Sequence, residues 1–158
     1  MFILKSKFLL SNLGLISLLT ALPLNNSASQ VTPPLTKCYI RVDNPHLSKS
    51  LKRLKGFDAV KVNAVSTCNR DLMNLRFTVE IKKKGFIRDY EVADRTIEFS
   101  GVIPANKEVA HKGTWVRCEN GRPSRYYGIA YARGVIDGKI VQTLPVITEK
   151  IVVLPCGT

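Results

Sequence analysis

The sequence has few of the residue patterns on which catalysis and metal binding depend. Its two histidines, His46 and His111, are far apart in the chain. It contains no glycine-rich phosphate loop and no group of His, Cys, Asp and Glu at metal-ligand spacing. Its carboxylates are scattered, so neither a paired-acid glycosidase site nor a calcium cage is indicated. These absences predict a protein that is not an enzyme and that uses no cofactor and no metal.

One segment does contain the residue types of a hydrolase triad. Asp43, His46 and Ser48 lie within six positions of one another. On so short a segment they cannot easily take the positions of orienting acid, base and nucleophile. We therefore expect His46 to hydrogen-bond to the backbone at a cap or at the end of the fold.

The four cysteines do not form a Cys-x-x-Cys pair, which argues against a zinc ribbon or a thioredoxin-type redox site. An even number of cysteines, in a chain that begins with a predicted secretory signal peptide, instead predicts two structural disulfides. Three pairings are possible for Cys38, Cys68, Cys118 and Cys156. We favour Cys38 with Cys68 and Cys118 with Cys156, because each bridge would join neighbouring strands and close a loop of moderate length.

Long apolar runs are missing except at the start of the chain. Lys5 and Lys7 precede the apolar run 8–22, and the small residues 27–29 follow it. This layout predicts a secretory signal peptide over residues 1–29. An uncleaved membrane anchor is the alternative, but polar interruptions make the run shorter than a spanning helix requires. We expect a secreted, extracellular protein with no integral membrane segment after cleavage.

The rest of the chain suits one domain with one core. Residues 30–37 include Pro33 and Pro34 and predict an extended lead-in, and residues 38–158 predict a single folded domain. Acidic residues are scarce in it. Of the 24 basic residues only Lys5 and Lys7 fall in the leader, so 22 face 12 acidic ones and the net charge is +10. Such an excess favours polyanionic partners and does not specify the fold.

Alternating hydrophobic patterns indicate strands. In residues 60–68 the side chains of Val60, Val62, Ala64, Ser66 and Cys68 share one face, which we expect to cover the core. Residues 74–84 alternate in the same way, and in 126–136 the small residues of one face suggest close approach of a neighbouring sheet. Asp137-Gly138 is a hairpin signal. The remaining predicted strands are 38–42, 86–92, 96–103, 114–118, 139–144 and 146–156, with a polar loop over 105–113.

Short strands separated by turn residues predict an all-β fold, an antiparallel immunoglobulin-like β-sandwich stapled by two disulfides. The likeness to immunoglobulin domains is one of architecture only, because Trp115 precedes Cys118 by three residues and does not lie between two paired cysteines. A small closed β-barrel is the alternative.

Residues 46–56 are the only helix-like piece of the predicted domain. Leu47, Leu51 and Leu54 are at helical spacing, and Gly56 is placed to end the helix. In one interpretation its basic residues form a patch for an anionic surface; in the other, which we prefer, the leucines plug the end of the sandwich. Lysines at a predicted hairpin tip could extend the patch. The candidate anion-binding residues are Lys49, Lys52, Arg53, Lys55, Lys82, Lys83 and Lys84.

The order of these features resembles a group of small secreted proteins of Gram-positive bacteria. The matching features are Cys38, His46-Leu47-Ser48, the strand 60–68, Leu75-Arg76-Phe77-Thr78-Val79, Cys118-Glu119-Asn120-Gly121, a tyrosine-rich strand and Cys156. The group shares this four-cysteine layout and mostly lacks an assigned function. The resemblance implies a disulfide-stapled β-sandwich and supplies no functional residues. The lysine content and the insert 122–125 depart from the pattern.

Taken together, these patterns predict a non-enzymatic binding module for an anionic cell-surface polymer or host component. The alternative is an inhibitor or toxin-like effector that binds another protein through loops 105–113 and 122–125. Arginines and tyrosines between 117 and 133 could stack on nucleic acid, but we do not expect nucleic acid as the partner of a secreted protein. The oligomeric state is not predicted.

Overall fold

The computed structural model describes residues 35–158. The predicted signal peptide, residues 1–29, and residues 30–34 of the predicted lead-in lie outside the described residues. Residues 35–37 have no regular secondary structure. They are held against the domain by Asn69, whose side-chain Oδ1 accepts a 2.7 Å hydrogen bond from the backbone N–H of Lys37 and whose Nδ2 donates to the carbonyl oxygen of Leu35.

One antiparallel sheet, here called sheet A, is built around a central strand. It contains β1 (Cys38–Val42), β2 (His46–Leu47), β3 (Ala59–Cys68) and β6 (Val109–Arg117). Strands β1 and β2 pair with one edge of β3, and β6 pairs with the other. The short helix α1 (Lys49–Lys55) connects β2 to β3.

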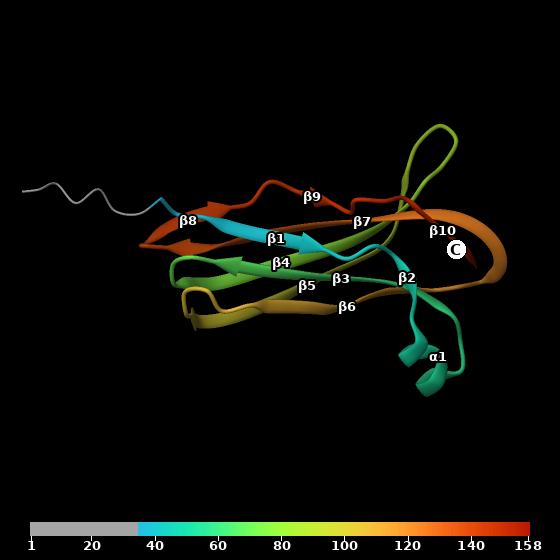
Figure 1. Ribbon diagram of the computed structural model, residues 1–158, viewed down its shortest axis with the longest axis horizontal. Helices are drawn as coiled ribbons and strands as arrows, with labels where there is room; N and C mark the ends of the chain where they lie inside the picture. The colour runs from blue at the N-terminus through green and yellow to red at the C-terminus, as the bar shows by residue number, and fades with distance from the viewer. Residues whose placement is uncertain (1–34) are drawn as a thin grey trace, which may run out of the picture. The chain divides into compact units, whose positions relative to one another are not determined.

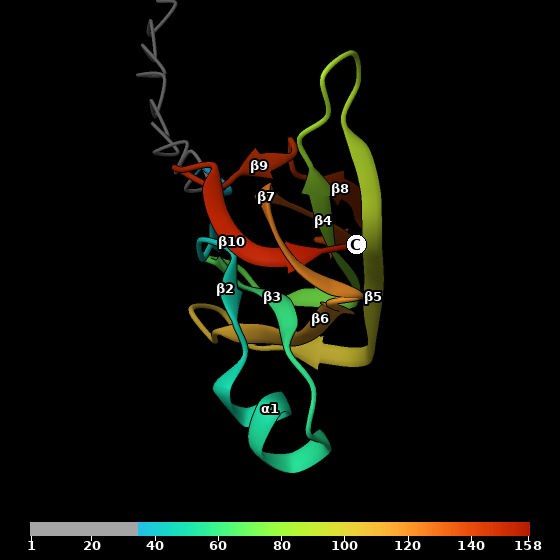
Figure 2. The same ribbon diagram turned by 90° about the vertical axis from the view of Figure 1, so that its right-hand side faces the viewer.

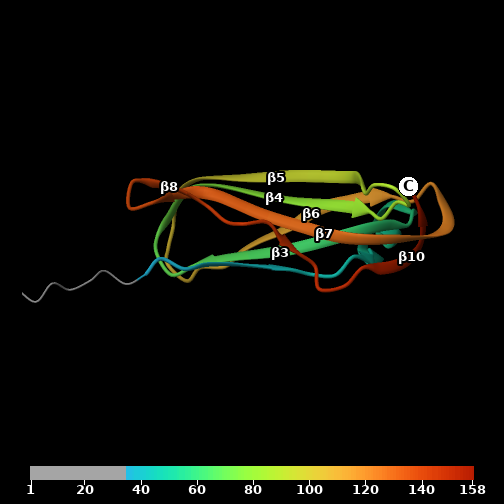
Figure 3. The same cartoon turned by 90° about the horizontal axis from the view of Figure 1, so that it is seen from above.

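The second sheet, sheet B, has the order β10-β7-β4-β5. Its long strands are β4 (Leu72–Lys83), β5 (Tyr90–Ile103) and β7 (Asn120–Ile136). Strands β8 (Lys139–Gln142), β9 (Val146–Ile147) and β10 (Val152–Gly157) all pair with β7. In Figure 3, β4, β5 and β7 lie along one side of the molecule and β1 and β3 along the other.

The apolar core lies between these two sheets, which confirms the predicted antiparallel β-sandwich; the alternative closed barrel is not formed. Side chains from both sheets supply the core, among them Val60 and Val62 of β3 and Phe77, Val79 and Ile81 of β4. Each set recurs at every second position, because successive side chains of a strand point to opposite faces. The inward face predicted for residues 60–68 is confirmed, since all five of its side chains are buried.

The prediction that small residues on one face of residues 126–136 allow close approach is also confirmed. The buried face of β7 includes Gly128, Ala130 and Ala132. A Cβ atom placed on Gly128 would lie only 2.7 Å from Cγ1 of Val62 on the opposite sheet. Small residues are therefore required here, since a larger side chain would force the two sheets apart.

The predicted hairpin at Asp137-Gly138 is present between β7 and β8. Asp137 has φ 50° and Gly138 has φ 73°, and Ile136 pairs with Lys139 across the turn. Positive φ at both central residues is the geometry of a type I′ turn, whose twist matches that of the flanking strands.

Several predicted strand boundaries are wrong. Residues 86–89 form a loop, and a single strand, β5, replaces the predicted strands 86–92 and 96–103. Strand β6 begins at Val109, inside the predicted loop 105–113, and residues 122–125 belong to β7. The predicted strand 146–156 is divided into β9 and β10. Pairing with β3, β4 and β7 sets these boundaries, and tertiary pairing of this kind overrides local preference.

Both favoured disulfides are present. Cys38–Cys68 joins directly opposite residues of β1 and β3 within sheet A. Cys118–Cys156 was expected to join neighbouring strands, but instead it connects Cys118, the residue after β6 of sheet A, to β10 in sheet B. Disulfides persist in oxidising environments such as the extracellular space. Within residues 35–158, no helix is long and apolar enough to cross a membrane.

Candidate functional site

The predicted helix is present as α1, and its ends are set by local sequence. Ser48 is the N-cap, and its Oγ accepts a hydrogen bond from the backbone N–H of Leu51 at 3.3 Å. Gly56 ends the helix with φ 74°, and its N–H donates to the carbonyl oxygen of Lys52 at 3.0 Å. The helix projects from the body of the sandwich (Figures 1 and 2).

The preferred interpretation of this helix, in which its leucines plug the end of the sandwich, is wrong for Leu54. That side chain is 75% exposed, and no residue of α1 is buried. Only Leu47, in β2 before the helix, packs against the core. The seven residues of α1 make only about two turns. Because the helix projects away from the sandwich, its side chains do not reach the core. The helix therefore presents a cationic surface with an apolar side chain in it.

The basic residues of α1 differ in their partners. Lys52 forms an ion pair with Asp58, its Nζ lying 3.1 Å from Oδ1. Lys49, Arg53 and Lys55 have no ion pair with any residue in the described range, 35–158. No acidic residue lies in the first turn of the helix. Three of the four predicted cations of this segment are thus not neutralised.

Two aromatic rings lie next to α1, beside Lys55. The ring centroids of Phe57 and Trp115 are 5.7 Å apart. Nζ of Lys55 lies 5.3 Å from the ring centroid of Trp115, and the guanidinium of Arg117 lies 4.9 Å from that of Phe57. Both distances are in the range of cation–π contact. We use the name α1 face for the cations of α1 that have no ion pair, Lys49, Arg53 and Lys55, together with the neighbouring Phe57, Trp115 and Arg117.

Sequence patterns identified only part of the α1 face. They used Trp115 only to argue against a true immunoglobulin domain, and they grouped Arg117 with more distant arginines and tyrosines. Phe57 follows the C-cap of α1, and Trp115 pairs opposite Lys61 on β3. The alternation of β6 predicts that Trp115 and Arg117 share a face. The structure adds that this face lies next to α1.

The second predicted set of cations, Lys82–Lys84, is held by partners. Nζ of Lys82 lies 2.9 Å from Oε2 of Glu80 and 2.7 Å from Oε2 of Glu91. The hydrogen bond to Glu91, with a further one to Glu80, raises the pKa of Lys82 well above its usual range.

The other two lysines of this set also have partners. Lys83 donates to the carbonyl oxygen of Thr158, and Lys84 forms an ion pair with Asp89 at 3.1 Å. The β4–β5 connection that follows them and α1 project in opposite directions (Figures 1 and 2). The structure therefore does not bring the two predicted cationic sets together in one patch.

The residues of the triad-like segment have separate partners. Nδ1 of His46 donates to the carbonyl oxygen of Asn44 at 3.1 Å, as expected of a residue that hydrogen-bonds to the backbone. The carboxylate of Asp43 lies 4.0 Å from Nε of Arg41, and Ser48 is the N-cap of α1. Across residues 35–158, no three His, Cys, Asp or Glu side chains are grouped so as to hold a metal ion.

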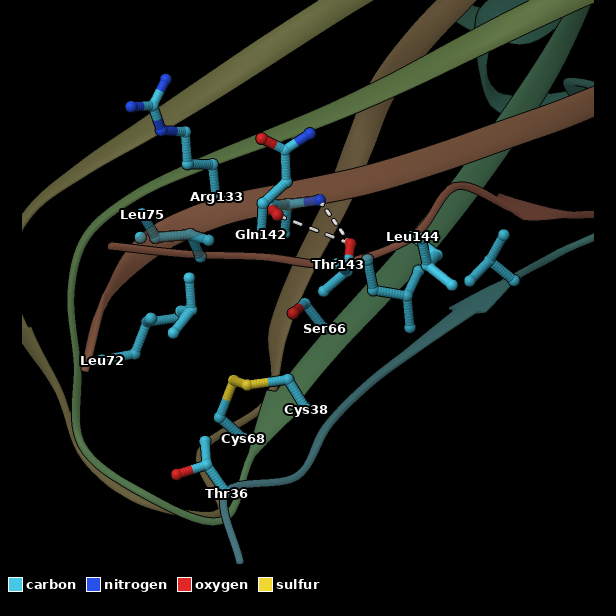
Figure 4. Close-up of a pocket in the computed structure, with 15 residues that line it drawn as sticks. Thr36, Cys38, Ser66, Cys68, Leu72, Leu75, Arg133, Gln142, Thr143 and Leu144 are labelled. Atoms are coloured by element: carbon cyan, nitrogen blue, oxygen red, sulfur yellow. Dashed lines mark hydrogen bonds between the residues drawn. A yellow bond between two sulfur atoms is a disulfide. The ribbon is translucent and has the colours of Figure 1, made fainter. Parts of the chain in front are cut away.

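An apolar cavity of about 450 Å³ lies between the sheets at the end of the sandwich where Cys38 and Cys68 are joined. Figure 4 shows the disulfide on its wall and the hydroxyl of Ser66 pointing into it. On the other side Oγ1 of Thr143 accepts a 2.9 Å hydrogen bond from the N–H of Ala132. The volume of the cavity is in the range of small-molecule sites. None of the residues labelled in Figure 4 directs a charged group into it.

His111 is buried in β6, at a position predicted to be a loop. Its side chain is fully buried and meets the ring of Phe77 edge to face, at a centroid distance of 5.7 Å. Nδ1 accepts from the N–H of Gly113 at 3.3 Å, so Nε2 carries the proton and donates to the carbonyl oxygen of Arg95 at 3.0 Å. Burial lowers the pKa of His111, and the nearby charge of Arg95 lowers it further.

Stability is expected to fall on mild acidification because of His111. Its folded pKa is below that of the unfolded chain, so the unfolded chain takes up the proton first. The contribution of His111 to the free energy of unfolding is fully present above the unfolded pKa, about 6.5. It is lost as the pH falls from there toward the folded pKa. Urea unfolding between pH 7.5 and 5.5 measures the slope. His111→Gln removes the titration, and an unchanged slope in this variant would contradict the assignment.

No model of a protein family matches the chain, and no curated protein matches it significantly. The resemblance to four-cysteine secreted proteins of Gram-positive bacteria stays a prediction.

Proposed function

We propose that the protein is a secreted, non-enzymatic binding module that holds an anionic polymer of a cell surface or a host through the α1 face. The observation that carries this proposal is that Lys49, Arg53 and Lys55 of one short helix have no ion pairs within residues 35–158 and that Lys55 lies beside the Phe57–Trp115 pair. Repeated anionic groups of a polymer would meet several of these cations at once, and the rings supply apolar contact to its backbone.

The rest of the structure supports this role by holding the α1 face in place. The helix and the segment after it form a loop closed at its base, because the N–H of Ser48 donates to the carbonyl oxygen of Ala59 and the N–H of Cys118 donates to that of Asp58. The disulfide of Cys118 anchors the same region to sheet B. A surface that is already ordered loses less conformational entropy when it binds.

The alternative, an inhibitor or effector that binds a protein through loops 105–113 and 122–125, loses most of its surface. Strand β6 begins at Val109, and residues 122–125 lie within β7. Residues 109–113 and 122–125 lie in paired strands, so only residues 105–108 remain as an exposed loop for this function.

Reversing charge on the α1 face should abolish polymer binding. The variant K49E/R53E/K55E places three carboxylates where three cations meet the polymer, and we expect affinity to fall by about 100-fold or more at low salt. The slope of log K against log salt concentration should also become shallower by about 2, as expected when three charge contacts are lost. Calorimetry with heparin and with a teichoic acid measures both quantities.

A matched control separates the α1 face from net charge. Lys37, Lys107 and Lys139 are exposed and belong to the end of the sandwich near Cys68, so K37E/K107E/K139E changes the charge equally at a distance from α1. We expect it to retain most of its affinity. Equal losses in the two variants would show that overall charge alone attracts the polymer, and binding that resists high salt would refute a polyanion as the ligand.

A further inference from the structure

The loop between β4 and β5 carries the most exposed pair of large apolar side chains in the described chain. Phe86 is fully exposed and Ile87 is 92% exposed. They are adjacent in a loop that projects beyond the sandwich, drawn in yellow-green in Figures 1 and 2. Single exposed apolar residues are ordinary on protein surfaces, but two bulky ones together on a projecting loop indicate a contact site.

This loop is held in one conformation by Asp89. Its carboxylate accepts hydrogen bonds from the hydroxyl of Tyr127 at 2.8 Å, from Nζ of Lys84 at 3.1 Å and from the N–H of Gly85 at 3.3 Å. The hydrogen bond from Tyr127 is the main reason that the pKa of Asp89 is lowered, so the carboxylate stays ionised at neutral pH. Phe86 and Ile87 are thus presented by an ordered turn.

Gly85 shows how tightly the turn is folded. A Cβ atom at this position would collide with the carbonyl oxygen of Arg88 and would lie 2.6 Å from the ring of Tyr90. Only glycine fits this approach of backbone to backbone. The turn therefore closes directly behind the two apolar side chains.

Two arginines belong to the base of this apolar tip. Arg88 lies next to it, with its guanidinium 5.5 Å from the ring centroid of Tyr90, and Arg125 is brought close by the hydrogen bond from the N–H of Lys84 to its carbonyl oxygen. Neither arginine forms an ion pair with another residue of the described range. The tip is thus apolar, and the surface behind it is positively charged.

We propose that this loop inserts Phe86 and Ile87 into the interface of a membrane that contains anionic lipids. The two apolar side chains would enter the boundary between headgroups and acyl chains, while Arg88 and Arg125 remain at the level of the lipid phosphates. The pairing of an apolar tip with a cationic base favours a lipid surface over a pocket in a protein, because both parts then meet complementary chemistry. Since α1 projects in the opposite direction, the α1 face stays open when the loop is inserted.

Vesicle binding tests the proposal. The oxidised protein is sedimented with vesicles of phosphatidylcholine, with and without phosphatidylglycerol. We expect binding to the anionic vesicles, and F86S/I87S should weaken it by on the order of tenfold or more, because the apolar part of the contact is lost. R88E should weaken binding to the anionic vesicles only. F86W should show a blue-shifted emission that brominated lipids quench.

Ile140 and Leu144 provide the matched control. They are also exposed apolar residues but belong to β8 and the segment that follows it. I140S/L144S removes similar apolar surface and should bind as the unaltered protein does. Equal binding by F86S/I87S and the unaltered protein would overturn the proposal. So would the absence of binding to either vesicle, which would leave a protein as the class of partner. K49E/R53E/K55E should retain vesicle binding, which separates this test from that of the α1 face.

Discussion

Replacing Cys118 and Cys156 by alanine should lower the free energy of unfolding by about 4 kcal/mol, the first of the two largest effects that we expect. The bridge closes a loop with a sequence separation of 38 residues, and it restricts the unfolded chain accordingly. In the folded state it also connects sheet A to sheet B next to the buried Tyr126, whose hydroxyl donates to the carbonyl oxygen of Cys156. Urea unfolding of the oxidised proteins measures the difference.

The Cys38–Cys68 bridge is the control for this prediction. Its sequence separation is 30 residues, so chain entropy predicts a similar loss, also about 4 kcal/mol, for C38A/C68A. A much greater loss for C118A/C156A would show that linking the two sheets contributes beyond the restriction of the unfolded chain. A loss below about 1 kcal/mol in C118A/C156A would contradict the entropic argument.

Replacing Phe77 by alanine should lower the free energy of unfolding by about 3 to 5 kcal/mol. Phe77 is fully buried at the centre of β4 and meets the His111 ring of the facing sheet. Removal of the ring loses its transfer free energy and leaves a cavity that two paired sheets cannot close. It also exposes one face of His111, so the acid sensitivity of stability should decrease in the same variant.

Phe86→Ala is the matched control, because Phe86 is fully exposed and has no core contact to lose. We expect its free energy of unfolding to stay within about 0.5 kcal/mol of the unaltered protein. Thermal and urea unfolding of both variants give the comparison. If the two losses were equal, Phe77 would not have the core position described here.

Most of the sandwich follows from alternation along single strands. Val60 and Val62 are buried because every second side chain of a strand faces the same way, and this periodicity is visible without knowledge of any neighbour. The same argument placed Cys68 inward. Positive φ at Asp137 and Gly138 follows from residue preferences in a two-residue turn.

Strand boundaries were harder to predict where pairing extends a strand beyond its local pattern. β5 continues from Tyr90 to Ile103 because β4 lies beside it over the whole length. His111 was predicted to lie in a polar loop. Its burial depends on a hydrogen bond to the carbonyl oxygen of Arg95 on another strand, which the local sequence does not show. Strand partners and hydrogen-bond partners of this kind are distant in sequence, so local patterns do not predict them.

In the candidate sites, too, local features were predicted and features set by tertiary contacts were not. The basic residues of α1 and its end at Gly56 were predicted from the sequence, whereas the N-cap role of Ser48 was not. The exposure of Leu54, the ion pairs of Lys82 and the projection of Phe86 were not predicted, because each depends on what lies across a strand pair or beyond a turn.

The sequence by itself determined the all-β class, the inward face of β3 and two disulfides whose favoured pairing is confirmed, because backbone alternation and cysteine chemistry act over short distances. The tertiary structure alone decided which cations are neutralised and which apolar side chains face solvent. Electrostatic and packing partners are set by strand register and by the direction in which a connection leaves the sheet, and a linear pattern specifies neither.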